Sequence, residues 1–152
     1  MVTITYEKIF SRFLSRLSDP RIVSWTEDEV YEWELEFLHS ATADVRFRNA
    51  FSAFKCDDVG QEVIFELEYS LDDQADSEYV IDLIVLGMVI AWMGPEVENL
   101  TMIGLMIGGK EEKKLVDHHS VTKERYNELQ SRFYKKIRDR DYLYNDYIEG
   151  YI

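Results

Sequence analysis

The apolar stretch from Tyr79 to Met93 constrains the fold more than any other part of the chain. It runs for about 15 residues, and Asp82 is its only charged position. A helix that is apolar nearly all round is buried at the centre of a protein, whereas a membrane-spanning helix needs about 20 such residues. We therefore predict a central core helix from Glu78 to Met93, capped by the polar turn Asp72–Ser77 and ended by Gly94-Pro95, and we expect no contact with a membrane.

Four other segments carry apolar residues at helical spacing. The first is predicted to begin at Thr5 and to end at Asp19-Pro20, and the last is predicted to run from Thr122 to about Arg140. A second begins at a capping box formed by Thr26 and Glu29, and a short third follows a cap at Asp44. The third helix is expected to carry four apolar residues at helical spacing: Phe47, Ala50, Phe51 and Phe54.

Between Glu62 and Leu71 the period changes to alternation, which predicts a half-buried β-strand. A strand needs a partner for its backbone groups, and Leu100–Ile107 is the other segment with strand character. Either the two pair within the chain, or one of them adds to a sheet of a neighbouring subunit. The oligomer interface predicted for the second arrangement consists of Val63, Phe65, Leu67, Met102, Leu105 and Met106.

The predicted fold class is therefore mainly α, with about five helices around a central apolar helix and a small β-hairpin or single augmenting strand. No linker or internal repeat divides the chain, so residues 1–140 are predicted to form one helical domain. Within it, a long loop is expected from Gly94 to about Ser120, and loops of that length are uncommon unless they bind something.

Residues 141–152 contain four tyrosines and three aliphatic residues with neither a helical nor a strand period. Ordinary chain ends are polar and fray, so this segment is predicted to be an arm that docks on another surface or packs back onto its own domain. The predicted partner-binding residues combine the arm with the basic residues before it: Lys135, Lys136, Arg138, Tyr142, Leu143, Tyr144, Tyr147, Ile148 and Tyr151.

The net charge of −13 is distributed unevenly. Residues 110–140 contain ten basic and six acidic residues, a net charge of +4, which leaves −17 for the rest of the chain. Such a dipolar molecule suits head-to-tail contact with copies of itself or docking onto a partner of opposite charge, although a solvated helix in an acidic protein gives the same pattern. The overall charge argues against non-specific binding of nucleic acid, for which the basic, aromatic helix 123–140 is the one candidate.

Three short motifs lack the complete pattern that their chemistry requires. His118-His119 has no further ligands at a known metal spacing, and Cys56, the only cysteine, has no local signature of a catalytic thiol. Gly108-Gly109-Lys110 lacks the hydroxyl residue and the strand–loop–helix setting of a phosphate-binding loop. We predict no catalytic residue, no metal and no cofactor, and a protein that is not an enzyme.

Five segments resemble the head–tail connector proteins of tailed bacteriophages, also called adaptor or neck proteins. They are the opening Ile4–Phe10, the acidic strand Glu62–Tyr69, the helix Leu86–Trp92, the loop Gly108–Glu111 and the ending Ile137–Tyr142. The resemblance covers most of the chain. It implies a small helical domain that forms a ring beneath the portal, extends the DNA channel and offers a platform to the next protein, with a C-terminal segment that reaches the portal.

On this basis we expect a structural virion protein, assembled in the host cytoplasm into a homo-oligomeric ring at the phage neck between portal and tail. The expected partners are copies of itself, the portal protein, the next neck or tail protein, and passing DNA contacted without sequence specificity. The acidic first half of the chain would face the channel or solvent. The alternative is an intracellular adaptor or regulatory protein that binds one protein partner through its C-terminal arm.

Overall fold

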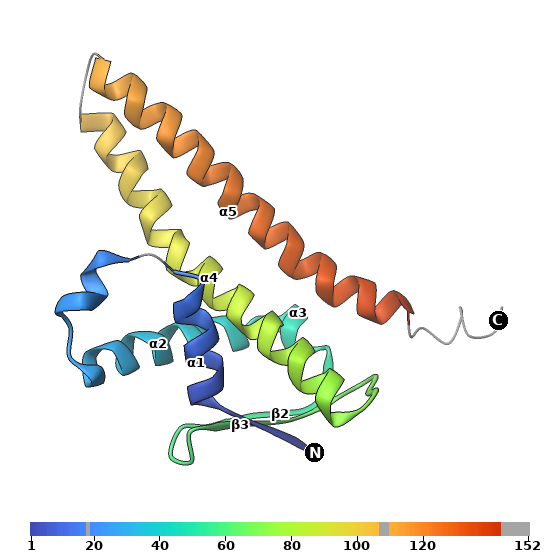
Figure 1. Ribbon diagram of the computed structural model, residues 1–152. Coiled ribbons are helices and arrows are strands. Elements are labelled where there is room, and N and C mark those ends of the chain that lie inside the picture. The colour runs from blue at the N-terminus through green and yellow to red at the C-terminus, as the bar shows by residue number, and fades with distance from the viewer. Residues whose placement is uncertain (18, 107–109, 144–152) are drawn as a thin grey trace.

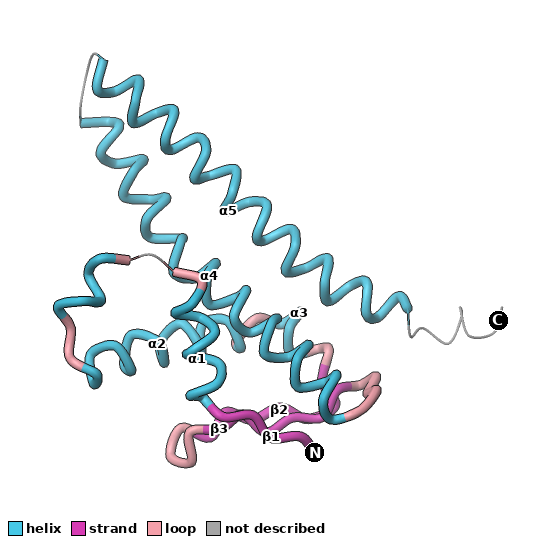
Figure 2. Tube along the Cα trace, viewed as in Figure 1, coloured by secondary structure: helices cyan, strands magenta, loops and turns pink. Residues whose placement is uncertain are grey.

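The computed structural model describes the backbone of residues 1–17, 19–106 and 110–143. This part of the chain contains five α-helices, one short 3₁₀-helix and one three-stranded antiparallel sheet (Figures 1 and 2). The predicted fold class, mainly α with a small β element, is confirmed. In chain order the elements are β1 (Val2–Thr5), α1 (Tyr6–Ser15), the 3₁₀-helix η1 (Pro20–Ser24), α2 (Glu27–Thr42), α3 (Val45–Arg48), β2 (Phe51–Asp57), β3 (Glu62–Leu67), α4 (Asp73–Met106) and α5 (Lys110–Leu143).

Helix α4 forms the centre of the fold, as predicted, and contacts α1, α2, α5 and β1. Seven of its apolar side chains are at most 6% exposed: Val80, Ile81, Leu83, Ile84, Val85, Leu86 and Met88. The predicted end at Gly94-Pro95 is wrong, because α4 continues through Pro95 to Met106. A proline inside a helix removes one backbone hydrogen bond, yet α4 continues through Pro95 alongside α5.

Helices α4 and α5 form a long antiparallel hairpin that crosses the view of Figure 1 diagonally, with the sheet below one end. The predicted loop from Gly94 to Ser120 and the predicted strand at Leu100–Ile107 are therefore wrong. Residues 100–106 are helical, and α5 begins at Lys110 rather than at Thr122. A short apolar run suits a strand and a buried helix equally well, so the neighbouring helix decides between them. The predicted interface residues Met102, Leu105 and Met106 lie on α4, and their side chains lie outside the described part.

Helix α4 is also the one described helix that could cross a membrane by length and composition, over residues 73–98. Half of its apolar window is buried inside the chain, and the core helix of a soluble protein meets the same criterion. The packing of α4 against α1, α2, α5 and β1 buries part of this apolar surface within the chain.

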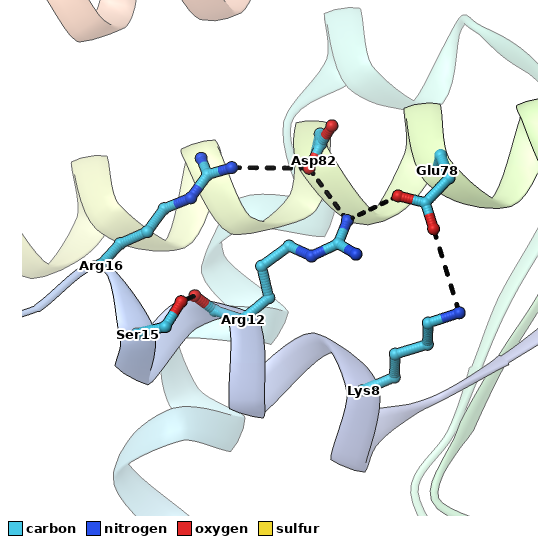
Figure 3. Close-up of polar contacts among 6 residues, drawn as sticks. All are labelled: Lys8, Arg12, Ser15, Arg16, Glu78 and Asp82. Atoms are coloured by element: carbon cyan, nitrogen blue, oxygen red, sulfur yellow. Dashed lines mark hydrogen bonds and ion pairs between the residues drawn. The ribbon is translucent and has the colours of Figure 1, made fainter.

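The acidic residues of α4 that face α1 are paired with basic side chains, as Figure 3 shows. Arg12 lies 2.9 Å from the Glu78 carboxylate and 3.0 Å from the Asp82 carboxylate. Arg16 reaches Asp82 at 3.5 Å, and Lys8 reaches Glu78 at 4.0 Å. The one charge inside the predicted apolar stretch, Asp82, is therefore held at the α1–α4 contact by two arginines.

Strand β3 lies in the middle of the sheet, in the order β1-β3-β2. It pairs antiparallel with β1 on one edge and with β2 on the other. The strand predicted at Glu62 is thus confirmed over Glu62–Leu67, but Leu100–Ile107 is not its partner. Both edges of β3 are used within the chain, and Val63, Phe65 and Leu67 are 0%, 0% and 3% exposed. Their predicted role in an interface with a neighbouring subunit is therefore wrong, because they form the core.

The predicted third helix is shorter than expected, because Phe51 and Phe54 lie on strand β2. Residues three apart on a regular strand point to opposite faces. A shift of register between Phe51 and Ala53 changes this, and both rings contact Phe47, with centroid distances of 4.9 Å and 5.2 Å. The irregular strand therefore presents aromatic rings at intervals that also fit a helix.

The predicted helix starts are confirmed at both N-terminal helices. The Thr5 hydroxyl accepts a hydrogen bond from the Lys8 amide at the start of α1. At the start of α2, the Thr26 hydroxyl accepts from the Glu29 amide, and the Glu29 carboxylate accepts from the Thr26 amide. The capping box fixes the first turn of α2, which carries the acidic surface described below.

Candidate subunit interface

The predicted partner-binding residues of α5 do not all lie on one surface. Lys135 and Arg138 are exposed, whereas Lys136 is half-buried and its Nζ lies 5.8 Å from the centre of the Tyr79 ring. Burial lowers the pKa of Lys136 below its ordinary value. Ile137, between Lys136 and Arg138, is buried. Lys136 is therefore less accessible than Lys135 and Arg138, and its predicted role in partner binding stays a prediction.

The predicted start of the C-terminal arm at residue 141 falls inside α5, which continues to Leu143. Tyr142 and Leu143 lie in its last turn. The other predicted arm residues fall outside the described part of the chain: Tyr144, Tyr147, Ile148 and Tyr151. Their binding role stays a prediction.

The C-terminal end of α5 is tied to the start of α4 by a buried ion pair that the sequence patterns did not indicate. Arg140 lies 3.2 Å from the carboxylate of Asp76, which is 1% exposed. It also donates to the Tyr69 carbonyl at 2.8 Å, and its guanidinium lies 4.2 Å from the centre of the Tyr79 ring. The Asp76 carboxylate additionally accepts from the Ser70 hydroxyl. These contacts set the place from which the chain continues beyond α5.

The exposed side of α5 carries more basic than acidic residues. Between residues 123 and 139, five basic residues and three acidic residues are exposed. Lys135 lies near the middle of this side, with Arg132 and Arg138 three residues before and after it. We call these three residues the basic ridge. Arg132 also pairs with Glu128 at 2.9 Å, one turn away.

The exposed side of α2 carries the opposite charge. The helix contains no lysine or arginine, and five of its acidic residues are exposed: Glu27, Asp28, Glu29, Glu32 and Glu36. Helix α4 packs against both α2 and α5, and the exposed sides of α2 and α5 face away from it. The two charged sides of the molecule therefore lie on separate surfaces.

A shallow, open depression of about 390 Å³ lies on the acidic side of α2. It is lined by Trp25, Glu29, Glu32, Trp33 and Glu36, and we call it the tryptophan groove. The two indole rings meet edge to face, with centroids 5.4 Å apart. Trp33 is held from below by Phe13 and Phe37, at 5.8 Å and 4.9 Å. Aromatic faces beside carboxylates form a surface that suits cationic side chains.

A second cavity of about 220 Å³ lies where α2, α4 and α5 meet. Its polar groups are bonded to one another: Tyr134 donates to Asp44 at 2.9 Å, and Gln130 donates to the Tyr126 hydroxyl at 3.2 Å. Close approach of α4 to α2 depends on Gly87, since a Cβ there would lie 2.8 Å from the Ala41 Cβ. The polar groups that line this cavity therefore serve the packing of α2, α4 and α5.

Titratable groups also gather where the β2–β3 turn meets α1 and α2. The Asp58 carboxylate accepts from the Tyr6 hydroxyl at 2.5 Å and lies 3.0 Å from His39 Nε2. These two contacts hold the pKa of Asp58 below its ordinary value, and burial raises the pKa of Tyr6. Burial also raises the pKa of the nearby Cys56 thiol, which keeps it protonated and unreactive. The cluster pins the turn to the helices.

Within the described residues, no three His, Cys, Asp or Glu side chains gather as metal ligands do. The side chains of His118 and His119, and residues 108 and 109, lie outside the described part. No family model, curated protein or solved structure matches this chain. Function is therefore inferred from the two charged surfaces.

Proposed function

We propose that the protein is a structural subunit that assembles head to tail with copies of itself into a closed ring. The observation that carries the proposal is the separation of charge between the acidic side of α2 and the basic side of α5. Two different surfaces that complement each other make a heterologous contact, which closes into a ring when the rotation between subunits permits. Opposite charges also speed the encounter and suppress wrong orientations.

The resemblance to head–tail connector proteins gives the ring its proposed place, at a phage neck between portal and tail and around the DNA channel. A net charge of −13 supports this place, because DNA slides past a surface that repels it. The long α4–α5 hairpin adds a candidate platform for the next neck or tail protein (Figure 1).

The native mass of the purified chain tests the proposal, measured by light scattering at salt concentrations from about 0.05 M to about 1 M. We expect a mass that is a multiple of 18.0 kDa at low salt and that falls as salt rises. Ring-shaped particles in electron micrographs would mean that the head-to-tail contact closes into a ring. A monomer at every protein and salt concentration contradicts the proposal.

A single reversal of charge sharpens the test. Lys135→Glu should weaken assembly, because it puts a negative charge at the middle of the basic side of α5. The matched control is Lys55→Glu, which makes the same change at an exposed position of β2. Equal loss of assembly in both variants would show that net charge alone, and not the α5 surface, governs association.

A further inference from the structure

We propose that the tryptophan groove of one subunit receives the basic ridge of α5 from a second copy of the chain. This inference rests on the proposed self-assembly and names the two surfaces that form the contact. The groove residues are Trp25, Glu29, Glu32, Trp33 and Glu36, and the ridge residues are Arg132, Lys135 and Arg138.

The two surfaces match in length. Glu29, Glu32 and Glu36 follow each other at intervals of three and four residues, so they span about 10.5 Å along α2. The ridge residues follow each other at intervals of three, so they span about 9 Å along α5. Three negative and three positive charges can therefore face each other over nearly the same distance.

The indole rings favour a cationic occupant over other kinds. Trp25 and Trp33 are only partly buried, although they are large and apolar. Among the described side chains, the four contacts of a cation with an aromatic ring use Phe54, Tyr79 and Tyr134, and none uses Trp25 or Trp33. Tryptophan binds cations best of all aromatic side chains, and arginine is its commonest partner. An arginine of the ridge would stack on an indole face while its neighbours pair with the carboxylates.

The groove is also built to keep its shape. The capping box of Thr26 and Glu29 fixes the first turn of α2, and Trp33 rests on two buried or half-buried phenylalanines. A surface that is already ordered loses little conformational entropy on binding. Most of the conformational entropy lost on binding then comes from the long side chains of the ridge.

Charge exchange between the two surfaces tests this inference. One variant reverses the ridge (Lys135→Glu with Arg138→Glu), and another reverses the groove (Glu32→Lys with Glu36→Lys). Glu29 is left unchanged because it closes the helix cap. Each variant alone should associate at least about tenfold more weakly than the wild-type chain, since like charges then face each other.

Two combinations should restore assembly. A chain that carries both reversals has an acidic ridge and a basic groove, so its copies again complement each other. An equimolar mixture of the ridge variant and the groove variant should also assemble, because each surface then meets its opposite on the other chain. Circular dichroism and thermal melting would verify that each variant is folded.

The outcomes separate this inference from the proposed function. A wild-type chain that never assembles overturns the proposed function and the inference together. Assembly of the wild-type chain that survives both reversals, or that neither combination restores, overturns the inference and leaves self-assembly in place. Restoration by either combination supports the specific contact.

Fluorescence gives an independent readout of the indole rings. In a Trp92→Phe background, the emission comes from Trp25 and Trp33, and it should shift when the chain assembles. Trp25→Phe should weaken association about threefold, since phenylalanine binds cations less well than tryptophan. Emission that stays constant through assembly would place the interface elsewhere.

Discussion

Two buried carboxylates in this molecule, those of Asp76 and Glu34, differ in their hydrogen-bond and ion-pair partners. Asp76, at the start of α4, is 1% exposed and accepts hydrogen bonds from Arg140, the Ser70 hydroxyl and the Leu71 amide. Glu34, on the inner side of α2, is 5% exposed, and its Oε2 has no hydrogen-bond partner. The first carboxylate joins three segments of the chain. The second has no such partner at its Oε2 atom.

The difference shows in the ionisation of Glu34. Burial raises its pKa from the ordinary value of 4.5 to about 7. A raised pKa in the folded state means that the folded chain binds the proton more tightly than the unfolded chain. The free energy of unfolding therefore falls as the pH rises from about 4.5 to about 7. Helix α2 carries a titrating core group close to neutral pH.

The largest expected effect comes from making Asp76 resemble Glu34. Arg140→Met should lower the free energy of unfolding by about 3 kcal/mol, because it leaves a buried carboxylate without its cation. Denaturant titration would measure the loss. Arg125→Met is the matched control, since Arg125 is exposed on the same helix, lies outside the basic ridge and should change stability little. Equal losses would mean that burial of the pair is unimportant.

The next effect comes from removing the charge of Glu34. Glu34→Gln should raise the free energy of unfolding by about 2 kcal/mol at pH 8, because the amide needs no proton in order to be neutral. The advantage should shrink towards zero near pH 4, where Glu34 is already protonated. Denaturation of both chains across this pH range tests the slope.

Glu36→Gln provides the control for that profile, since Glu36 is exposed on the same helix. Its difference from the wild-type chain should stay nearly constant with pH. An advantage of Glu34→Gln that does not depend on pH would show that Glu34 is already neutral, or already solvated, in the folded chain.

A smaller effect tests whether the unpaired charge of Asp76 explains the loss of stability in Arg140→Met. Adding Asp76→Asn to Arg140→Met should recover about 1 kcal/mol of the lost stability, because the neutral side chain can still accept from the Leu71 amide. The four chains of this double-mutant cycle can be compared by denaturant titration. Further loss on adding the second substitution would contradict the role assigned to the unpaired charge.

The smallest effect is expected from the exposed pairs between α1 and α4. Arg12→Met removes contacts with Glu78 and Asp82, but water screens these charges and supplies other partners. The change in the free energy of unfolding should be the smallest of the four effects, and it should shrink further at about 1 M salt. A loss as large as that of Arg140→Met would mean that exposure does not distinguish the two networks.

Much of the fold followed from short stretches of sequence. The apolar segment at Tyr79–Met93 predicted the core helix, and Thr5, Thr26 and Glu29 predicted two helix starts. The alternation after Glu62 predicted a strand. Each of these signals depends on residues only a few positions apart, and the side chains concerned interact within one element.

The errors arose where a segment suits two structures. Pro95 and the glycine before it predicted a helix end, yet α4 passes through them because α5 lies alongside. The spacing of Phe47, Phe51 and Phe54 suits a helix. Phe51 and Phe54 instead lie on strand β2, where a shift of register lets both rings contact Phe47.

The uneven charge, the core helix and the helix caps can be predicted from the amino-acid sequence, because composition and local spacing specify them. The strands that flank β3, the pairing of Arg140 with Asp76 across 64 positions and the common groove of Trp25 and Trp33 depend on how the elements pack. Such contacts join residues that are distant in sequence or depend on side chains of another element, as Trp33 depends on Phe13. Their energies arise only once the elements have packed, so no local pattern records them.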